Sequence, residues 1–296
     1  MNQHTIRPLD DGDVTPLAEL IAQRQIDPTT HVAYVGITPD DVAAELAEAA
    51  DWRARTLVSY DADGRPTGVL LADIDRQMRR VWWCGPWTAD PSDADLARRL
   101  LEDAEERWGT LFDEQELGPD ARHAWMLTLA DERGFQAQTG SAILSVILAA
   151  APNGPDASQP ARTMPLRAAD RAGVAALHDL LFAGAHATGV QMVFDSENAI
   201  RVAHDGEGQV AGYISTQLQP DGSGYIEHLG VAEHARRHGC ARALVTDAMG
   251  DMAMRGVPSV HLAVPTDAPG ARSLFGGLGY TEERVIVVHR KGFLPE

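Results

Sequence analysis

The chain has 296 residues, enough for two domains of ordinary size, and its hydrophobic fraction of 44% and charged fraction of 23% are those of a globular protein. No stretch approaches the roughly 20 apolar residues of a membrane helix, and the acidic start MNQHTIRPLDDGD lacks a secretory signal, so we expect a cytoplasmic protein without membrane association. The net charge of −18 argues against nucleic acid as a partner, because phosphate backbones are bound by basic surfaces.

The first half is predicted to open with a short strand around Ile6, an acidic turn, and a helix whose apolar stripe includes Val14, Leu17 and Leu20. The segment TPDDVAAELAEAADW predicts a second helix, because Thr38 is a favoured N-cap and the apolar residues after it recur with a helical period. Strands are predicted at GRPTGVLLA and VWWCGPW, and a helix at ARRLLEDA.

A linker and an internal repeat divide the chain. Residues 149–162, AAAPNGPDASQPAR, are rich in Pro, Ala, Ser and Gly and have no apolar periodicity, which is typical of a linker. Beyond it the elements of the first half recur in the same order: Gly64 and Gly68 align with Gly208 and Gly212, and ARRLLEDA aligns with ARALVTDA. We therefore expect two domains of the same fold.

Each half has the predicted order strand, one or two helices, strands, helix, strand, helix, strands. This order combines an antiparallel meander with a βαβ crossover, which predicts an α/β (α+β) fold with a mixed, mostly antiparallel central sheet flanked by helices. The predicted domains are residues 1–148 and 163–296, joined by the linker 149–162. Cys84 and Cys240 lie far apart without CxxC or histidine-spaced partners, so we expect neither a disulfide nor a bound metal.

The stretch YIEHLGVAEHARRHGCARALVTDAM, from Tyr225 to Met249, is the most informative part of the sequence. It predicts a strand, a basic turn that contains glycine, and an amphipathic helix. The first N–H groups of a helix lack intrahelical partners and lie at the positive end of its dipole, so such a turn can hold a pyrophosphate. Gly239 lets phosphate approach the backbone, and Arg236, Arg237 and Arg242 add positive charge.

The stretch resembles the pyrophosphate loop of the GNAT superfamily of acyl-CoA-dependent N-acyltransferases. The family pattern of Arg or Gln, two residues, Gly, one residue, and Gly or Ala is met by Arg236, Gly239 and Ala241, and the downstream segments SVHLAV and ARSLFGGLGY also fit. The resemblance covers most of residues 163–293, and the repeat extends the fold to residues 5–148. It implies an acetyl-CoA donor held by Leu229, Gly230, Val231, Arg236, Arg237, His238, Gly239, Cys240, Ala241, Arg242 and Phe275.

The resemblance also assigns a general base. Glu227, expected on the same strand face as Leu229, corresponds to a carboxylate that deprotonates the incoming ammonium in many members. His228 would then point to the opposite face and be structural. The family pattern is incomplete, because Ala268 replaces a frequent Asn and Phe275 replaces a Tyr that often protonates the leaving thiolate. Catalysis would then rely on solvent, on another group such as Tyr280, or on differential binding alone.

The first half lacks this site. Where the second half has its arginine–glycine turn, the first half carries ADPSDADLA, whose aspartates would repel phosphate, and Trp83 stands opposite Glu227. We therefore expect a degenerate GNAT-like domain followed by an acyl-CoA-binding one that acetylates a small amine or a peptide amine by direct attack. A non-catalytic acyl-CoA-binding or regulatory protein is the alternative. A monomer and a homodimer both fit the sequence.

Overall fold

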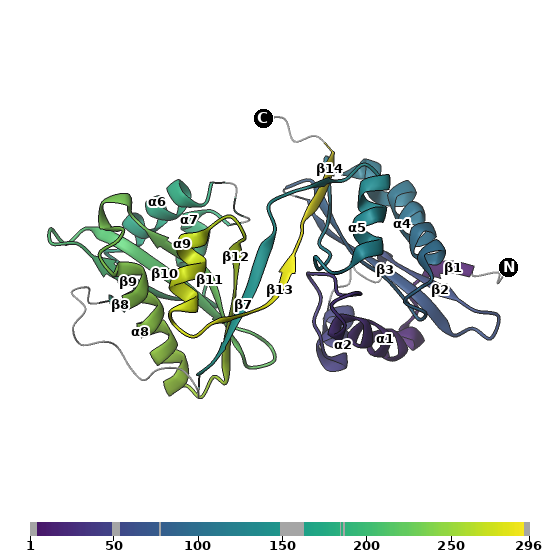
Figure 1. The fold of residues 1–296 in the computed structure, drawn as a ribbon, viewed down its shortest axis with the longest axis horizontal. Coiled ribbons are helices and arrows are strands. Elements are labelled where there is room, and N and C mark those ends of the chain that lie inside the picture. The colour runs from purple at the N-terminus through teal and green to yellow at the C-terminus, as the bar shows by residue number, and fades with distance from the viewer. Residues whose placement is uncertain are drawn as a thin grey trace. The chain divides into compact units, whose positions relative to one another are not determined.

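The computed structural model describes residues 5–48, 54–76, 78–148, 163–183, 185 and 187–292, and the predicted linker 149–162 lies outside them. The chain forms two compact units, residues 1–141 with 284–296, and residues 142–283. Each unit is built on one seven-stranded sheet (Figure 1). This arrangement confirms the predicted fold class of two mixed, mostly antiparallel sheets flanked by helices.

The first unit follows the predicted order of elements. Its strands and helices are β1 (Thr5–Pro8), α1 (Val14–Ile26), α2 (Pro39–Glu48), β2 (Thr56–Tyr60), β3 (Pro66–Asp75), β4 (Arg80–Thr88), α4 (Ala94–Trp108), β5 (Glu114–Leu117), α5 (Ala124–Glu132), β6 (Gln136–Ala137) and β14 (His289–Gly292). The backbone N–H of Asp41 donates to the Thr38 hydroxyl at 3.2 Å, which is the expected cap of α2.

The second unit repeats this order. Its elements are β7 (Ser141–Ile147), β8 (Thr163–Pro165), α6 (Arg171–Leu181), α7 (Gly189–Phe194), β9 (Ala199–His204), β10 (Val210–Leu218), β11 (Gly224–Val231), α8 (Cys240–Met254), β12 (Ser259–Pro265), α9 (Pro269–Gly276) and β13 (Thr281–Ile286). In each unit one central pair is parallel, β4 with β5 and β11 with β12. The meander strands before it pair antiparallel.

Equivalent glycines allow equivalent helices to pack onto the two sheets. A Cβ on Gly68 would lie 2.9 Å from Leu100 of α4, and a Cβ on Gly212 would lie 3.0 Å from Cys240 of α8. Side chains at these positions would push the helix away from the sheet, because packed interiors leave no room for an extra methyl group. The internal repeat predicted from sequence is therefore a repeat of packing as well as of element order.

The last strand of each half completes the sheet of the other half. The first sheet has the order β1-β2-β3-β4-β5-β14-β6, and the second has the order β13-β7-β12-β11-β10-β9-β8. In Figure 1 the teal strand β7 lies in the second sheet, and the yellow strand β14 lies in the first. The compact units thus differ from the predicted boundaries at 148 and 163, because pairing partners rather than chain order decide to which sheet a strand belongs.

Half-buried ion pairs hold β14 to the first unit. Arg290 of β14 lies 2.8 Å from Glu116 of β5, whose side chain is only 3% exposed, and Lys291 lies 2.7 Å from Glu105 of α4. The backbone of β14 pairs with β5 from His289 to Gly292. The carboxylates of Glu116 on β5 and Glu105 on α4 are thus paired with cations that come from the C-terminal end of the sequence.

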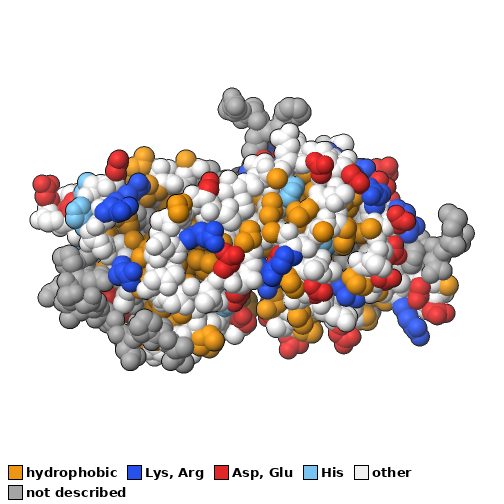
Figure 2. Space-filling view, in the orientation of Figure 1, with side chains coloured by type: hydrophobic (Ala, Val, Ile, Leu, Met, Phe, Trp, Pro, Cys, Tyr) orange, Lys and Arg blue, Asp and Glu red, His pale blue; other side chains and the backbone are white. Residues whose placement is uncertain are grey.

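Acidic and basic side chains are interspersed over the face drawn in Figure 2. Among the described residues no helix is long and apolar enough to cross a membrane.

Candidate active site

β11 loses its parallel partner halfway along its length. It pairs with β12 at Gly224, Tyr225 and Ile226, and the register goes no further, although both strands continue. On its other side β11 stays paired with β10 as far as Val231. The second half of β11 therefore has a sheet edge that faces the carboxyl end of β12, where its backbone groups are open to a ligand.

A β-bulge lies where this opening begins. Ser215 of β10 pairs with His228, and the next residue, Thr216, pairs with Ile226, so Glu227 is the extra residue. A bulge bends the strand and changes the direction of its side chains. The predicted shared face of Glu227 and Leu229 relies on regular alternation, and the bulge interrupts that alternation.

The turn after β11 has the backbone conformation of an anion cradle. Arg237 and Gly239 have positive φ values of 66° and 82°, and Gly239 is the N-cap of α8. The first intrahelical bond there runs from the N–H of Ala243 to the carbonyl of Gly239, at 3.0 Å. The N–H groups of the residues between them have no intrahelical acceptor and are free to bind an anion.

A cavity of about 860 Å³ joins the open half of β11 to this turn. Eight of the predicted cofactor residues line it: Leu229, Val231, Arg236, Arg237, Gly239, Cys240, Ala241 and Arg242. The sequence did not predict the remaining walls, which are Leu181 and Phe182 at the end of α6, Ala235, and the start of α9 with Pro269, Gly270, Ala271, Ser273 and Leu274. The pattern ARSLFGGLGY did predict a helix, but no motif or spacing indicated that its first turn faces the cavity.

Four predicted site residues lie outside the lining of this cavity. Gly230 faces the opposite side of the sheet, where a Cβ would lie 2.6 Å from the ring of Tyr213. Phe275 is 4% exposed and packs edge-on against Tyr280, with ring centroids 5.2 Å apart. His238 is exposed in the turn, and Glu227 is half-buried at the bulge. Gly230 and Phe275 therefore contribute to packing rather than to the lining of the cavity. Glu227 lies where the opening between β11 and β12 begins.

The cavity is electropositive at one end. Arg236 donates to the carbonyl of Val231 at 3.1 Å, and Arg242 approaches the carbonyl of Gly277 at 3.4 Å. Within the described ranges none of Arg236, Arg237 and Arg242 forms an ion pair with a carboxylate, although the whole chain is acidic. Three guanidinium groups and the α8 N-terminus together favour a polyanion such as a pyrophosphate.

The cysteine in the cavity is unsuited to covalent catalysis. Burial raises the pKa of the Cys240 thiol above its ordinary value, so the thiol stays protonated near neutral pH. The side chain instead packs against Gly212 on the sheet. A protonated, buried thiol is a weak nucleophile, and the site therefore offers no protein group for an acyl-enzyme intermediate at this position.

A histidine cluster borders the cavity on the α6 side. The buried His178 lies 2.7 Å from the Tyr213 hydroxyl through Nδ1 and 3.1 Å from the Ala187 carbonyl through Nε2. Because the carbonyl can only accept, Nε2 carries the proton and Nδ1 accepts from the tyrosine. The rings of His178 and Phe182 both contact His228 edge-on, with centroids 4.6 and 4.9 Å away. His228 thus lies next to a residue that lines the cavity.

Near Glu227 lies a phenol that remains protonated. Burial and then the charge of Glu227 raise the pKa of Tyr225 to about 12. Burial also raises the pKa of Tyr280, whose hydroxyl has no partner among the described atoms. Neither tyrosine lines the cavity.

The equivalent place in the first unit is closed by the chain itself. Asp93 accepts from the N–H of Leu96 at 3.0 Å and so caps α4, and its carboxylate takes the position available to a phosphate at α8. Arg24 donates to the carbonyls after β4, at Thr88 and Ala89. The ring of Trp87 is buried beside them. In the first unit these contacts occupy the place that corresponds to the turn before α8.

The first unit also fills the opening beyond its own parallel strand pair. Val32 forms an antiparallel bridge with Pro119, and Ala33 donates to the carbonyl of Gly118 at 2.8 Å. The segment between α1 and α2 thus covers the carboxyl end of β5. In the second unit the corresponding region belongs to the open cavity.

Comparisons with known proteins agree with this geometry. Residues 173–280 match the sequence model of the acetyltransferase (GNAT) family. A search of curated proteins gave no significant match. Similar solved structures include a GCN5-related N-acetyltransferase from Sphaerobacter thermophilus, with 21% identity, a TM-score of 0.80, and coverage of 99% of this chain and 96% of that one.

A second structure has the same two-unit organisation. A tandem GNAT protein from the clavulanic acid biosynthesis pathway is 17% identical, with a TM-score of 0.68 and coverage of 99% of this chain and 100% of that one. At these identities the likeness concerns the fold, whereas the family match rests on the sequence of the second half. Residues 173–280 therefore match the acetyltransferase (GNAT) family in sequence, and the chain has the fold of a tandem GNAT protein.

Proposed function

We propose that the second unit transfers an acetyl group from acetyl-CoA to a primary amine. The observation that carries the proposal is the cavity of about 860 Å³ in which the open edge of β11, three arginines and the α8 N-terminus meet. In the proposed complex the amides from Arg237 to Arg242 hold the pyrophosphate. The pantetheine and acetyl groups extend along Leu229 and Val231, whose backbone amides polarise the thioester carbonyl.

The proposed reaction is direct attack. The neutral amine nitrogen adds to the thioester carbon, the C–N bond forms, the C–S bond breaks, and the electron pair leaves with the CoA sulfur. Glu227 takes the proton that the ammonium must lose, directly or through water. The cavity has no tyrosine among its lining residues. Because a thiol has a pKa of about 8.5, the sulfur can leave as a thiolate, and the second proton that the nitrogen loses after attack reaches the thiolate through water.

A second candidate is a protein that binds acyl-CoA without turning it over. Phe275 packs away from the cavity and carries no acidic proton, Ala268 replaces the amide side chain frequent in the family, and Glu227 does not line the cavity. These features leave the binding site more complete than the catalytic one.

One experiment separates the two candidates. The full chain is incubated with acetyl-CoA and a panel of amino acids, polyamines, aminoglycosides and peptides, and release of the CoA thiol is followed in parallel with CoA affinity by calorimetry. Acceptor-dependent thiol release is expected. Tight CoA binding without release for any amine class would favour the non-catalytic candidate, and absence of binding would refute both.

A further inference from the structure

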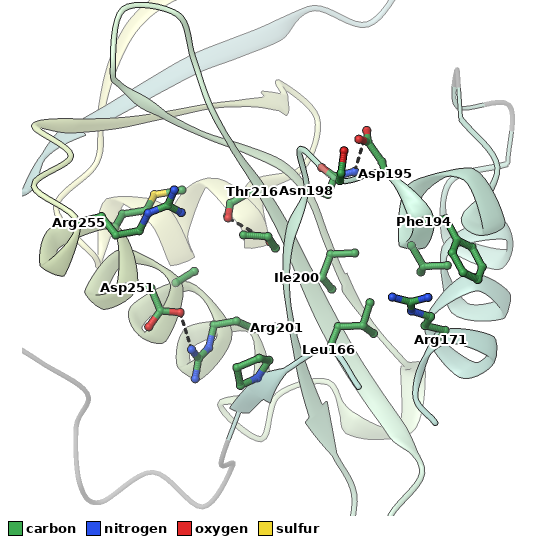
Figure 3. Close-up of a pocket in the computed structure, with 16 residues that line it drawn as sticks. Leu166, Arg171, Phe194, Asp195, Asn198, Ile200, Arg201, Thr216, Asp251 and Arg255 are labelled. Atoms are coloured by element: carbon green, nitrogen blue, oxygen red, sulfur yellow. Dashed lines mark hydrogen bonds and ion pairs between the residues drawn. The ribbon is translucent and has the colours of Figure 1, made fainter. Parts of the chain in front are cut away.

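A second cavity, of about 510 Å³, lies at the outer edge of β9 and shares no lining residue with the acyl-CoA cavity (Figure 3). On one side of β9 its walls come from the start of α6 and the end of α7, with Leu166, Arg171, Val193, Phe194 and Ile200. On the other side they come from β9, β10 and the end of α8, with Arg201, Thr216, Asp251, Met252 and Arg255. The volume is within the range of small-molecule sites.

The carboxylates of this cavity already have partners. Asp251 pairs with Arg201 at 2.5 Å, and Arg201 also donates to the Thr163 hydroxyl at 3.0 Å. Asp195 accepts from the N–H of Glu197 at 2.9 Å and from the Asn198 amide at 3.3 Å. The lining nevertheless contains more arginines than aspartates, which is unusual in so acidic a chain.

Two arginines of the lining have no carboxylate partner within the described part of the chain, and their positions differ. Arg255 is the C-cap of α8, where a cation complements the helix dipole, and its side chain is exposed to water. Arg171 is the first residue of α6, where the dipole disfavours a cation. Helix electrostatics therefore account for Arg255 and leave Arg171 without an explanation.

Arg171 packs against apolar groups, and one of its N–H groups has no acceptor among the described atoms. Its guanidinium lies 4.5 Å above the ring of Phe194, and its Nε is buried without an acceptor among the described atoms. A shielded N–H without an acceptor costs free energy, and a small shift of the guanidinium towards a ligand oxygen in the cavity removes that cost. Figure 3 shows the group next to Leu166 and facing Ile200.

We propose that this cavity binds a small organic carboxylate with an aliphatic or aromatic body. The carboxylate pairs with Arg171, and the body packs against Leu166, Val193 and Ile200. A cation such as Arg171 beside an apolar wall selects for an anion that is apolar elsewhere, because neither a bare inorganic ion nor a neutral hydrocarbon uses both features. The site is separate from the acyl-CoA cavity and does not depend on the proposed acetyl transfer.

The test uses the full chain and three carboxylates, phenylacetate, cyclohexanecarboxylate and 4-methylpentanoate, with phenylacetamide as the neutral counterpart. Methyl NMR spectra should show shifts confined to Leu166, Val193 and Ile200, and the amide should bind about tenfold more weakly than the acid because it lacks the charge-assisted bond. Saturating CoA should leave these shifts unchanged. Failure of all three acids to shift these methyl signals, or equal binding of acid and amide, would overturn the proposal.

Matched variants test the role of Arg171. Arg171→Gln should weaken carboxylate binding about tenfold and remove the preference over the amide. Arg167→Gln removes the same charge from an exposed residue outside the lining and should bind like the parent chain. Phe194→Ala alters a side chain that is 64% exposed, so it tests the contact with little risk to folding, and it should also weaken binding. Unchanged affinity in Arg171→Gln, or shifts centred on the Arg236 to Arg242 turn, would show that the anion binds elsewhere.

Discussion

Gly239 is the residue on which the proposed acyl-CoA cavity depends most directly. Its φ of 82° is disfavoured for other residues, and any side chain there would lie beside the proposed phosphate position. Gly239→Glu should lower CoA affinity at least tenfold, because a carboxylate then competes for the amides, while strain lowers stability by about 1–2 kcal/mol. Calorimetry measures the affinity and urea unfolding the stability.

Gly250 supplies a matched control. It lies on α8 with open space where a Cβ would be, so Gly250→Glu adds the same charge without entering the cavity. We expect its CoA affinity to match that of the parent chain. Equal affinity in the Gly239 variant as well would exclude the turn as the phosphate site.

Glu227 can be tested through the pH dependence of turnover. At low pH the amine is protonated and needs a base, whereas at high pH it is already neutral, so Glu227→Gln should reduce kcat most at low pH and least at high pH. Glu233→Gln, an exposed neighbour in the turn, should leave the profile unchanged. A uniform decrease at every pH would assign Glu227 a structural role instead.

His31 and His123 make the stability of the first unit depend on pH. Burial lowers the pKa of each from 6.5 to about 4, so the unfolded chain binds more protons than the folded one between these values. Stability is therefore full above pH 6.5 and falls as the pH drops towards 4. For His123 the loss between pH 7 and pH 5 is about 2 kcal/mol.

His123→Phe isolates this effect. Both ring nitrogens of His123 are buried without a partner among the described atoms, so a phenyl ring of similar size fits without losing a hydrogen bond. Urea unfolding followed by tryptophan fluorescence reports on the first half of the chain, which contains all six tryptophans. The variant should lose less stability than the parent between pH 7 and pH 5. Parallel losses would contradict a neutral, buried His123.

Strand β14 is the element that links the C-terminus to the first unit. Arg290→Gln leaves the buried carboxylate of Glu116 with one cation fewer, and we expect a loss of about 1–3 kcal/mol in the free energy of unfolding of that unit. Arg98→Gln breaks an exposed pair with Glu132 in the same unit and should cost less than about 1 kcal/mol. Tryptophan fluorescence in urea compares the two, and equal losses would mean that β14 contributes no more than a surface contact.

Considered as a whole molecule, the chain has one contiguous unit and one discontinuous unit. Residues 142–283 hold the proposed acyl-CoA cavity and most of the second sheet, in which β7 begins at Ser141 and β13 ends at Ile286. The predicted domain 163–296 lacks β7, which lies between β12 and β13. A fragment of residues 142–286 should fold and bind CoA. A fragment of residues 163–296 should melt at a lower temperature and bind more weakly, because a gap in the sheet leaves backbone groups unpaired.

Circular dichroism measures the melting temperature of each fragment, and calorimetry measures its affinity for CoA. Equal melting and equal affinity would show that β7 is dispensable for the second sheet.

The sequence by itself determined the local features. The strand, the glycine turn and the helix around Gly239 are consecutive in the chain, so spacing and residue type were enough to predict these three elements, whereas anion binding by the turn stays a prediction. The repeat of Gly68 and Gly212 in the sequence likewise predicted two units of similar fold. In the first half, the aspartates around the start of α4 predict the loss of the anion site, and the structure shows that one of them, Asp93, caps α4.

Only the tertiary structure decided the non-local features. The bulge at Glu227 depends on how β11 pairs with β10, and the cavity walls from α6 and α9 come from segments far from the motif. The sequence also did not predict that β7 and β14 join each other's sheets. An apolar strand pattern predicts burial in a sheet, but it does not specify which of two similar sheets the strand joins. That choice depends on partners such as Glu116 and Arg290, which are brought together only by folding.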